Sequence, residues 1–142
     1  MNTNLTEAQN DYAIFLPALS GFYATFVGKQ RFDQYVEADR IPSNFNNGME
    51  SLNYLNKDEG QFQYKWTVYS AGHADLDVTK HSPKEDMVRN RDRENTWVLG
   101  DSGGFQIGKG VWEGDWKDPN CPKAHKKRDG VLRWMDAYMD YG

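Results

Sequence analysis

The chain has 142 residues, of which 38% are hydrophobic, 27% charged and 14% aromatic, and its formal net charge is −4. That length allows one domain with a core but not a complete eight-fold α/β barrel, which takes about 250 residues. No apolar run is long enough to span a membrane, the start lacks a secretory signal, and the single cysteine, Cys121, excludes an internal disulfide. We therefore expect a cytoplasmic protein without membrane contact.

The first half of the chain contains two candidate strands. Residues 1–12 are polar and are expected to be loose. The apolar run A-I-F-L, residues 13–16, predicts a buried strand, whereas the aromatic segment 19–29 has no clear type. Apolar residues at helical spacing predict a helix over 49–55. Residues 62–70, F-Q-Y-K-W-T-V-Y-S, alternate in polarity and predict the second strand.

The second half adds two helices and one strand. Ser82 is a candidate cap for a helix that begins with Pro83, has Glu85 three residues after the cap, and runs to about residue 94. T-W-V-L, residues 96–99, predicts a short buried strand that opens into a long glycine-rich connection. Apolar residues recur at helical spacing from about residue 123 to residue 140 and predict the last helix.

The order of these elements predicts an α/β fold of parallel βα units over residues 13–142. Three parallel strands with nothing to close them leave unpaired edges. We therefore expect the first part of a larger fold, incomplete in this chain.

The stretch W-V-L-G-D-S-G-G-F-Q-I-G-K-G, residues 97–110, has three interpretations. G-D-S-G-G also surrounds the nucleophile of chymotrypsin-like proteases, but Ser102 would need His73 as its base across a helix and a strand, and Phe105 stands where those proteases have proline. A phosphate cradle is weakly indicated, because the G-K-S/T ending is absent and Asp101 would repel a phosphate.

The third interpretation is a site for a flat, purine-like base. Asp101 follows a parallel strand, at the edge where α/β folds place ligands. Two glycines allow a close approach, one aromatic ring offers a stacking face, and polar groups offer donors and acceptors. The residues concerned are Asp101, Ser102, Gly103, Gly104, Phe105 and Gln106. In the alternative, purely structural interpretations, Asp101 only caps the following turn and Phe105 is a core residue.

The hexapeptide D-S-G-G-F-Q, residues 101–106, resembles the signature of the tRNA-guanine transglycosylase family, including relatives that insert deazaguanines into DNA. The βα order from about Ile14 to Gly142 is similar as well. The resemblance implies a (β/α)8 barrel that exchanges guanine in a polynucleotide for a modified guanine. It implies that Asp101 holds the base and handles its proton, that Phe105 stacks on it, and that Ser102, Gly103, Gly104 and Gln106 line the pocket.

The resemblance also implies what this chain does not carry. The attacking aspartate and the zinc site of three cysteines and a histidine are expected beyond Gly142, so the chain alone should be inactive, Cys121 is not a zinc ligand, and no cofactor or metal is expected here. The second predicted strand ends in S-A-G-H, residues 70–73, instead of Asn-Thr-Tyr-His. This difference favours a divergent, phage-type branch that modifies DNA.

The expected partners are a nucleic acid, tRNA or DNA, and a guanine-like base, and a homodimer stays open. Basic residues near the end of the sequence either contact phosphates or form a solvated helix face: Lys123, Lys126, Lys127 and Arg128. His73 either supports the pocket or is structural. Trp112 and Trp116 form a lid, a nucleic-acid contact or a hydrophobic plug. The alternative function is a small non-enzymatic α/β binding protein associated with nucleic-acid modification.

Overall fold

The centre of the protein is a two-stranded parallel sheet. The computed structural model describes residues 3–30 and 36–142. Strand β1 (Trp66–Ser70) pairs with β2 (Trp97–Asp101), and the register places Ser70 opposite Asp101. The predicted strands 62–70 and 96–99 are thus present, the first shortened at its start. The chain is a small α/β protein, and the described residues do not form a barrel.

Two short segments extend this sheet on its outer edges. Residue 18 bridges Val68, and residue 141 bridges Leu99, both in parallel. The amide of Leu19 donates to the Val68 carbonyl at 2.8 Å, and the amide of Gly100 donates to the Tyr141 carbonyl at 2.6 Å. The strand predicted at 13–16 is therefore wrong: the pairing begins at Pro17, whose carbonyl accepts from the Val68 amide at 3.0 Å.

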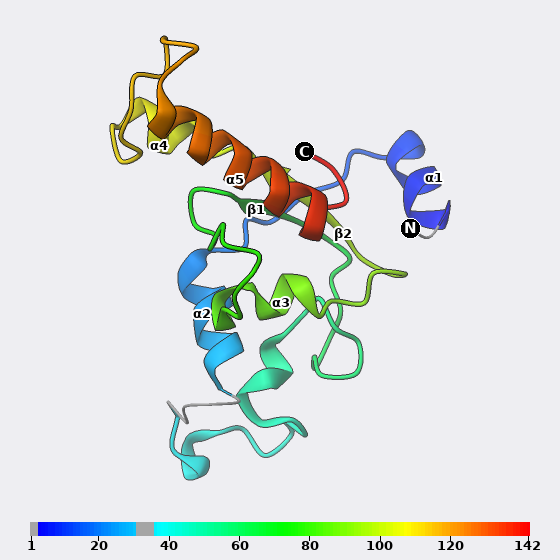
Figure 1. Cartoon of the computed structure of the whole chain (residues 1–142). Helices are drawn as coiled ribbons and strands as arrows, with labels where there is room; N and C mark the ends of the chain where they lie inside the picture. Colours follow the sequence, from blue (N-terminus) through cyan, green and yellow to red (C-terminus); the bar gives the residue numbers. More distant parts are fainter. Residues whose placement is uncertain (1–2, 31–35) are drawn as a thin grey trace.

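Several helices lie close to the two strands (Figure 1). None of the helices in the described ranges is long and apolar enough to cross a membrane. In chain order they are α1 (Thr3–Asp11), α2 (Gly21–Lys29), the 3₁₀ turns η1 (Ala38–Arg40), η2 (Gly48–Leu52) and η3 (Pro83–Glu85), and then α3 (Asp86–Arg89), α4 (Gly104–Gly108) and α5 (Pro122–Tyr138).

Several of these helices differ from the prediction. Residues 3–11 are helical instead of loose. The untyped aromatic segment forms α2, which Ser20 caps by accepting from the Tyr23 amide at 3.1 Å. The helix predicted over 49–55 is only the 3₁₀ turn η2. The last predicted helix is confirmed as α5, but the glycine-rich connection contains an unforeseen short helix, α4.

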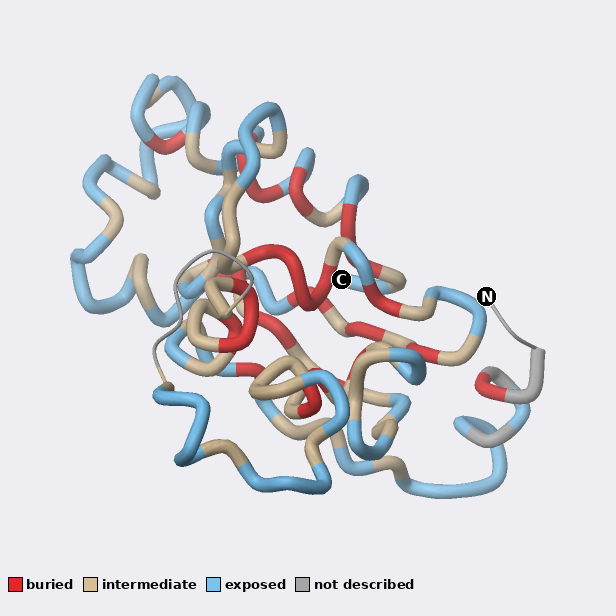
Figure 2. The backbone as a smooth tube through the Cα atoms, turned by 90° about the horizontal axis from the view of Figure 1, so that it is seen from below, coloured by how far each residue is buried: buried red, intermediate tan, exposed pale blue. Residues whose placement is uncertain are grey.

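The two faces of the sheet have different surroundings. Thr67, Tyr69 and Val98 are fully buried and face α2, α3 and α5, with the Tyr69 ring edge-on to Trp134 at 5.7 Å between centroids. Figure 2 shows buried positions in the middle of the molecule and exposed ones around it. The other face carries apolar side chains that are only half-buried: Trp66, Val68, Trp97 and Leu99. Parallel strands normally have both faces covered, so this face is unusual.

Glu85 is the central polar residue of the core, with 2% of its surface exposed. Its carboxylate accepts from the Tyr69 hydroxyl at 2.9 Å, from the Asp75 amide at 2.7 Å and from the Trp134 indole at 3.1 Å. Burial raises the pKa of Glu85, an effect that these hydrogen bonds oppose only in part. The predicted capping role is wrong: Ser82 makes no side-chain cap, Glu85 points inward, and α3 ends at Arg89.

A second buried charge ties the segment after α5 to β2. The Asp140 carboxylate accepts from the Val98 amide at 2.7 Å and from the Arg91 guanidinium at 3.2 Å. Arg91 is 5% exposed, and burial lowers its pKa to about 10. The pair therefore holds residues 140–141 beside the sheet.

We expect Glu85→Gln to lower the free energy of unfolding by about 1–3 kcal/mol, because the new amide must point an N–H group at a donor. The effect should depend on pH. A raised folded-state pKa means that the contribution of Glu85 is largest below its ordinary value of 4.5 and declines as the pH rises through the folded-state value.

Denaturation of both proteins at several pH values measures this. The stability difference should be widest near about pH 4 and narrow as the pH rises. Glu94→Gln, at an exposed glutamate, is the matched control and should change little. A difference that is constant over pH would contradict the prediction.

Candidate functional site

The site is built at the edge where both strands end. The Ser70 hydroxyl donates to Oδ2 of Asp101 at 2.6 Å, and the amide of Ala71 donates to the Asp101 carbonyl at 2.9 Å. Asp101 is exposed, and its Oδ1 accepts no hydrogen bond from the described residues. The carboxylate is therefore held at one oxygen and available to a ligand at the other.

Asp101 does not cap the turn that follows it. The N-cap of α4 is Gly103, which has a left-handed φ of 78° and no side-chain cap. A Cβ at this position would lie 2.5 Å from the Trp112 ring. Only glycine satisfies both the turn and this close approach, so the first glycine of the hexapeptide is needed by the fold as well as by any ligand.

Phe105 lies on α4 and is 68% exposed, so it is not a core residue. The ammonium group of Lys109 lies 5.8 Å from its ring centroid. An exposed aromatic ring four residues after a fixed carboxylate offers a stacking surface next to a hydrogen-bonding group. Ser102 and Gly104 are also exposed in the intervening turn.

Gln106 lies between this loop and the turn after β1. A Cβ on Gly72 would be 2.0 Å from Oε1 of Gln106, so the amide packs directly on that backbone. This oxygen is buried and has no partner among the residues that the structure describes. The Gln106 carbonyl accepts from the amides of Val111 and Trp112, at 2.9 and 3.3 Å. Gln106 thus connects the carboxyl edge to the segment that carries Trp112.

His73 follows β1 and is brought to the same edge of the sheet. It is exposed, its amide donates to the Ser70 carbonyl at 3.0 Å, and its Cβ packs against Gly21. Its ring makes no hydrogen bond within the described ranges. Its support of the pocket stays a prediction.

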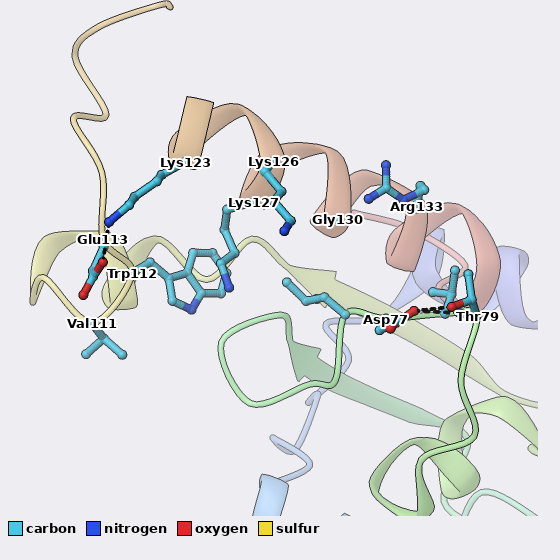
Figure 3. A pocket seen from close by; sticks show the side chains of 12 residues that line it. Asp77, Thr79, Val111, Trp112, Glu113, Lys123, Lys126, Lys127, Gly130 and Arg133 are labelled. Carbon is cyan, nitrogen blue, oxygen red and sulfur yellow. Dashed lines mark hydrogen bonds and ion pairs between the residues drawn. The ribbon is translucent and has the colours of Figure 1, made fainter. Parts of the chain in front are cut away.

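The basic residues of α5 are divided between two environments. Lys123, Lys126 and Lys127 line a cavity of about 840 Å³ between α5, residues 76–79 and residues 111–113, whereas Arg128 does not (Figure 3). Lys123 pairs with Glu113 at 2.7 Å, which lowers the pKa of the glutamate and raises that of the lysine. Lys127 lies 4.9 Å from the Trp112 ring centroid.

Of the three roles expected for Trp112, the structure fits that of a hydrophobic plug. It packs against the buried core, touches Gly103, and stacks on Trp116 at 6.3 Å between centroids. The Trp116 indole donates to the Trp112 carbonyl at 3.1 Å. The stacked pair therefore supports the loop that carries Asp101.

The described part of the chain holds no cluster of His, Cys, Asp and Glu side chains suited to a metal ion. Cys121 is half-buried and its sulfur accepts from the Asp115 amide at 3.3 Å. Backbone hydrogen bonds lower the pKa of this thiol. The zinc site that the resemblance implies stays a prediction.

Sequence reasoning missed two residues of this site. Ser70 was foreseen only as the end of a strand, although pairing the ends of the two predicted strands would have set it against Asp101. Arg133 also lines the cavity. It lies about three helical turns after Lys123 on the same side of α5. From the sequence, only the basic residues grouped at 123–128 were considered, and the helical spacing was not extended to Arg133.

We expect Gly103→Ala to lower the free energy of unfolding by about 1–2 kcal/mol or more, because alanine resists the left-handed conformation and its Cβ would press on Trp112. Gly108→Ala is the control, since a Cβ there meets nothing within 4 Å. Chemical denaturation and tryptophan fluorescence measure both effects. Equal stabilities of the two variants would show that the turn tolerates other residues.

No family model, curated protein or solved structure matches this chain.

Proposed function

We propose that residues 101–106, the base loop, bind a guanine-type base, and that the chain is part of a transglycosylase that exchanges guanine for a 7-deazaguanine in tRNA or DNA. The observation that carries the proposal is the Asp101 carboxylate, which Ser70 holds at 2.6 Å while its second oxygen is available. The exposed Phe105 ring, one helical turn further on, completes a site with an edge contact and a stacking face.

The chemistry of guanine suits this arrangement. Its ring N–H and its exocyclic amine are neighbouring donors, and a carboxylate can accept from both. Oδ1 of Asp101 is available for one of them, and Oδ2 can accept a second bond beside that from Ser70, because each carboxylate oxygen has two lone pairs. Adenine presents an acceptor in place of the ring N–H, so the same carboxylate disfavours it.

The order of the parallel segments supports the finer fold, the first part of a (β/α)8 barrel. Residues 17–19, β1, β2 and residues 140–141 lie side by side in sequence order. That order is typical of barrels, whereas doubly wound sheets reverse direction at a switch point. Ser70 and Asp101 share a sheet face with the half-buried Val68 and Leu99, which is the face that would line a barrel.

The resemblance supplies the reaction. An aspartate outside these residues attacks C1′ of the sugar, the bond to guanine breaks, and the incoming base then displaces the aspartate. In that scheme Asp101 is the group that orients the departing and arriving bases and handles their proton. The half-buried sheet face gives further βα units a surface against which to pack.

The second candidate is a small binding protein without catalytic activity. One observation favours it: the outer edges of β1 and β2 both have a partner, at residues 18 and 141. Base binding would then be the whole activity of the base loop. Both candidates require that the base loop binds a base.

We expect Asp101→Asn to weaken guanine binding at least tenfold, because a hydrogen bond to a charged group contributes about 1.5–3 kcal/mol. The preference for guanine over hypoxanthine, which lacks the exocyclic amine, should disappear. Calorimetric titration of both bases measures this, with Asp136→Asn, an exposed carboxylate of α5, as the control. Unchanged guanine affinity in Asp101→Asn would remove the basis of the proposal.

We expect Phe105→Ala to weaken the binding of guanine and of hypoxanthine by a similar factor, since stacking contributes about 1–3 kcal/mol per base and does not depend on edge groups. Stability should barely change, because the ring is 68% exposed. Phe15→Ala is matched in exposure, at 75%, and lies far from the base loop in sequence. If both variants bind guanine like the wild type, Phe105 does not stack on the base.

A further inference from the structure

The cavity beside α5 has a basic wall that the base loop does not use. We call it the basic cleft and define it by Trp112, Lys126, Lys127 and Arg133. Figure 3 shows Trp112 near Lys127, Lys126 beside them on the helix, and Arg133 further along the helix. Leu76, Val78 and Val111 complete the apolar part of its lining.

The positive charge of the basic cleft is not neutralised by its own carboxylates. Glu113 is paired with Lys123 at 2.7 Å, and Asp77 accepts from Thr79 and pairs with Lys80 at 3.3 Å. In contrast, Lys126, Lys127 and Arg133 form no ion pair with any carboxylate in residues 3–30 and 36–142. Three cations therefore face one cavity in a chain whose net charge is −4.

These cations form a row instead of a cluster. Lys126 and Arg133 are seven residues apart on α5, which corresponds to about 10 Å along the helix axis at 1.5 Å per residue. A single phosphate would need its ligands to converge on one point. A row of this length matches a chain of successive phosphates. The Trp112 ring, against which Lys127 lies at 4.9 Å, keeps one of the cations in place.

The basic cleft and the base loop share a wall. The Trp112 ring borders the cleft, and its edge is the group that a Cβ on Gly103 would meet at 2.5 Å. The Trp112 ring therefore separates a polymer lying in the cleft from the turn between Asp101 and Phe105. An enzyme that acts on a base must take that base out of the stack of neighbouring bases. The phosphates on either side of the base then need a positively charged groove.

We propose that the basic cleft binds the phosphodiester backbone of a single-stranded polynucleotide whose target base enters the base loop. Lys126, Lys127 and Arg133 contact successive phosphates, and Arg128 does not take part. The placement of the base rests on the proposed function, whereas the binding of the strand depends on the cleft alone.

Fluorescence anisotropy with labelled oligo(dT) and oligo(rU), and with the same strands carrying one guanine, tests this over a range of salt concentrations. The logarithm of the binding constant falls linearly with the logarithm of the salt concentration. Each lost phosphate contact makes this negative slope shallower by about 0.7 for a single strand. We expect Lys126→Gln/Arg133→Gln to make the slope shallower by about 1.4 for every oligonucleotide. Lys117→Gln/Arg128→Gln removes the same charge from exposed positions outside the cleft and should leave the slope unchanged.

The charge-preserving variant Lys126→Arg/Arg133→Lys should keep the wild-type slope, which separates charge from packing. Equal losses in the two Gln double variants would mean diffuse attraction and would overturn the proposal. So would the absence of salt-dependent binding, or competition by inorganic phosphate as effective as that by oligo(dT). If the oligonucleotides with one guanine bind no more tightly than those without it, and the salt slopes are as expected, the result would count against the proposed function but would support strand binding in the basic cleft.

Discussion

The arrangement of the molecule depends on the buried carboxylate of Glu85. Its three donors come from the middle of β1, from the loop after β1 and from α5, so one side chain sets the positions of a strand, a loop and a helix relative to one another. The same loop and helix form opposite walls of the basic cleft. The two oxygens of a carboxyl group can accept from three donors, whereas an apolar residue can accept from none, which explains why the core tolerates a group whose burial is costly.

The exposed edge repeats this chemistry with one difference. Asp101 also accepts from a neighbouring strand, but only at one oxygen and in contact with solvent. A group held in place without being saturated is what recognition of a ligand requires, since little order must be gained when the ligand binds. Two contacts hold the base loop in place: Gly103 packs on Trp112, and Gln106 packs on the turn after β1.

The sequence was most informative where patterns were local and strong. The strand before the hexapeptide, the last helix and the parallel α/β class followed from periodicity and order. Other features depended on partners distant in the chain. Pro17 to Leu19 pair with Val68 although the apolar run precedes them, and Glu85 looked like a capping residue because its real partner Trp134 lies 49 positions away. Ser70 escaped notice for the same reason: its role exists only once two strands lie in register.

Trp112 has a consequence that neither site has alone. Its indole contacts the turn of the base loop on one side and a cation of α5 on the other, so a ligand that displaces the ring from one direction changes the room available in the other. Thermodynamic linkage makes any such coupling reciprocal: the factor by which a bound strand alters the affinity for a free base equals the factor by which the base alters the affinity for the strand.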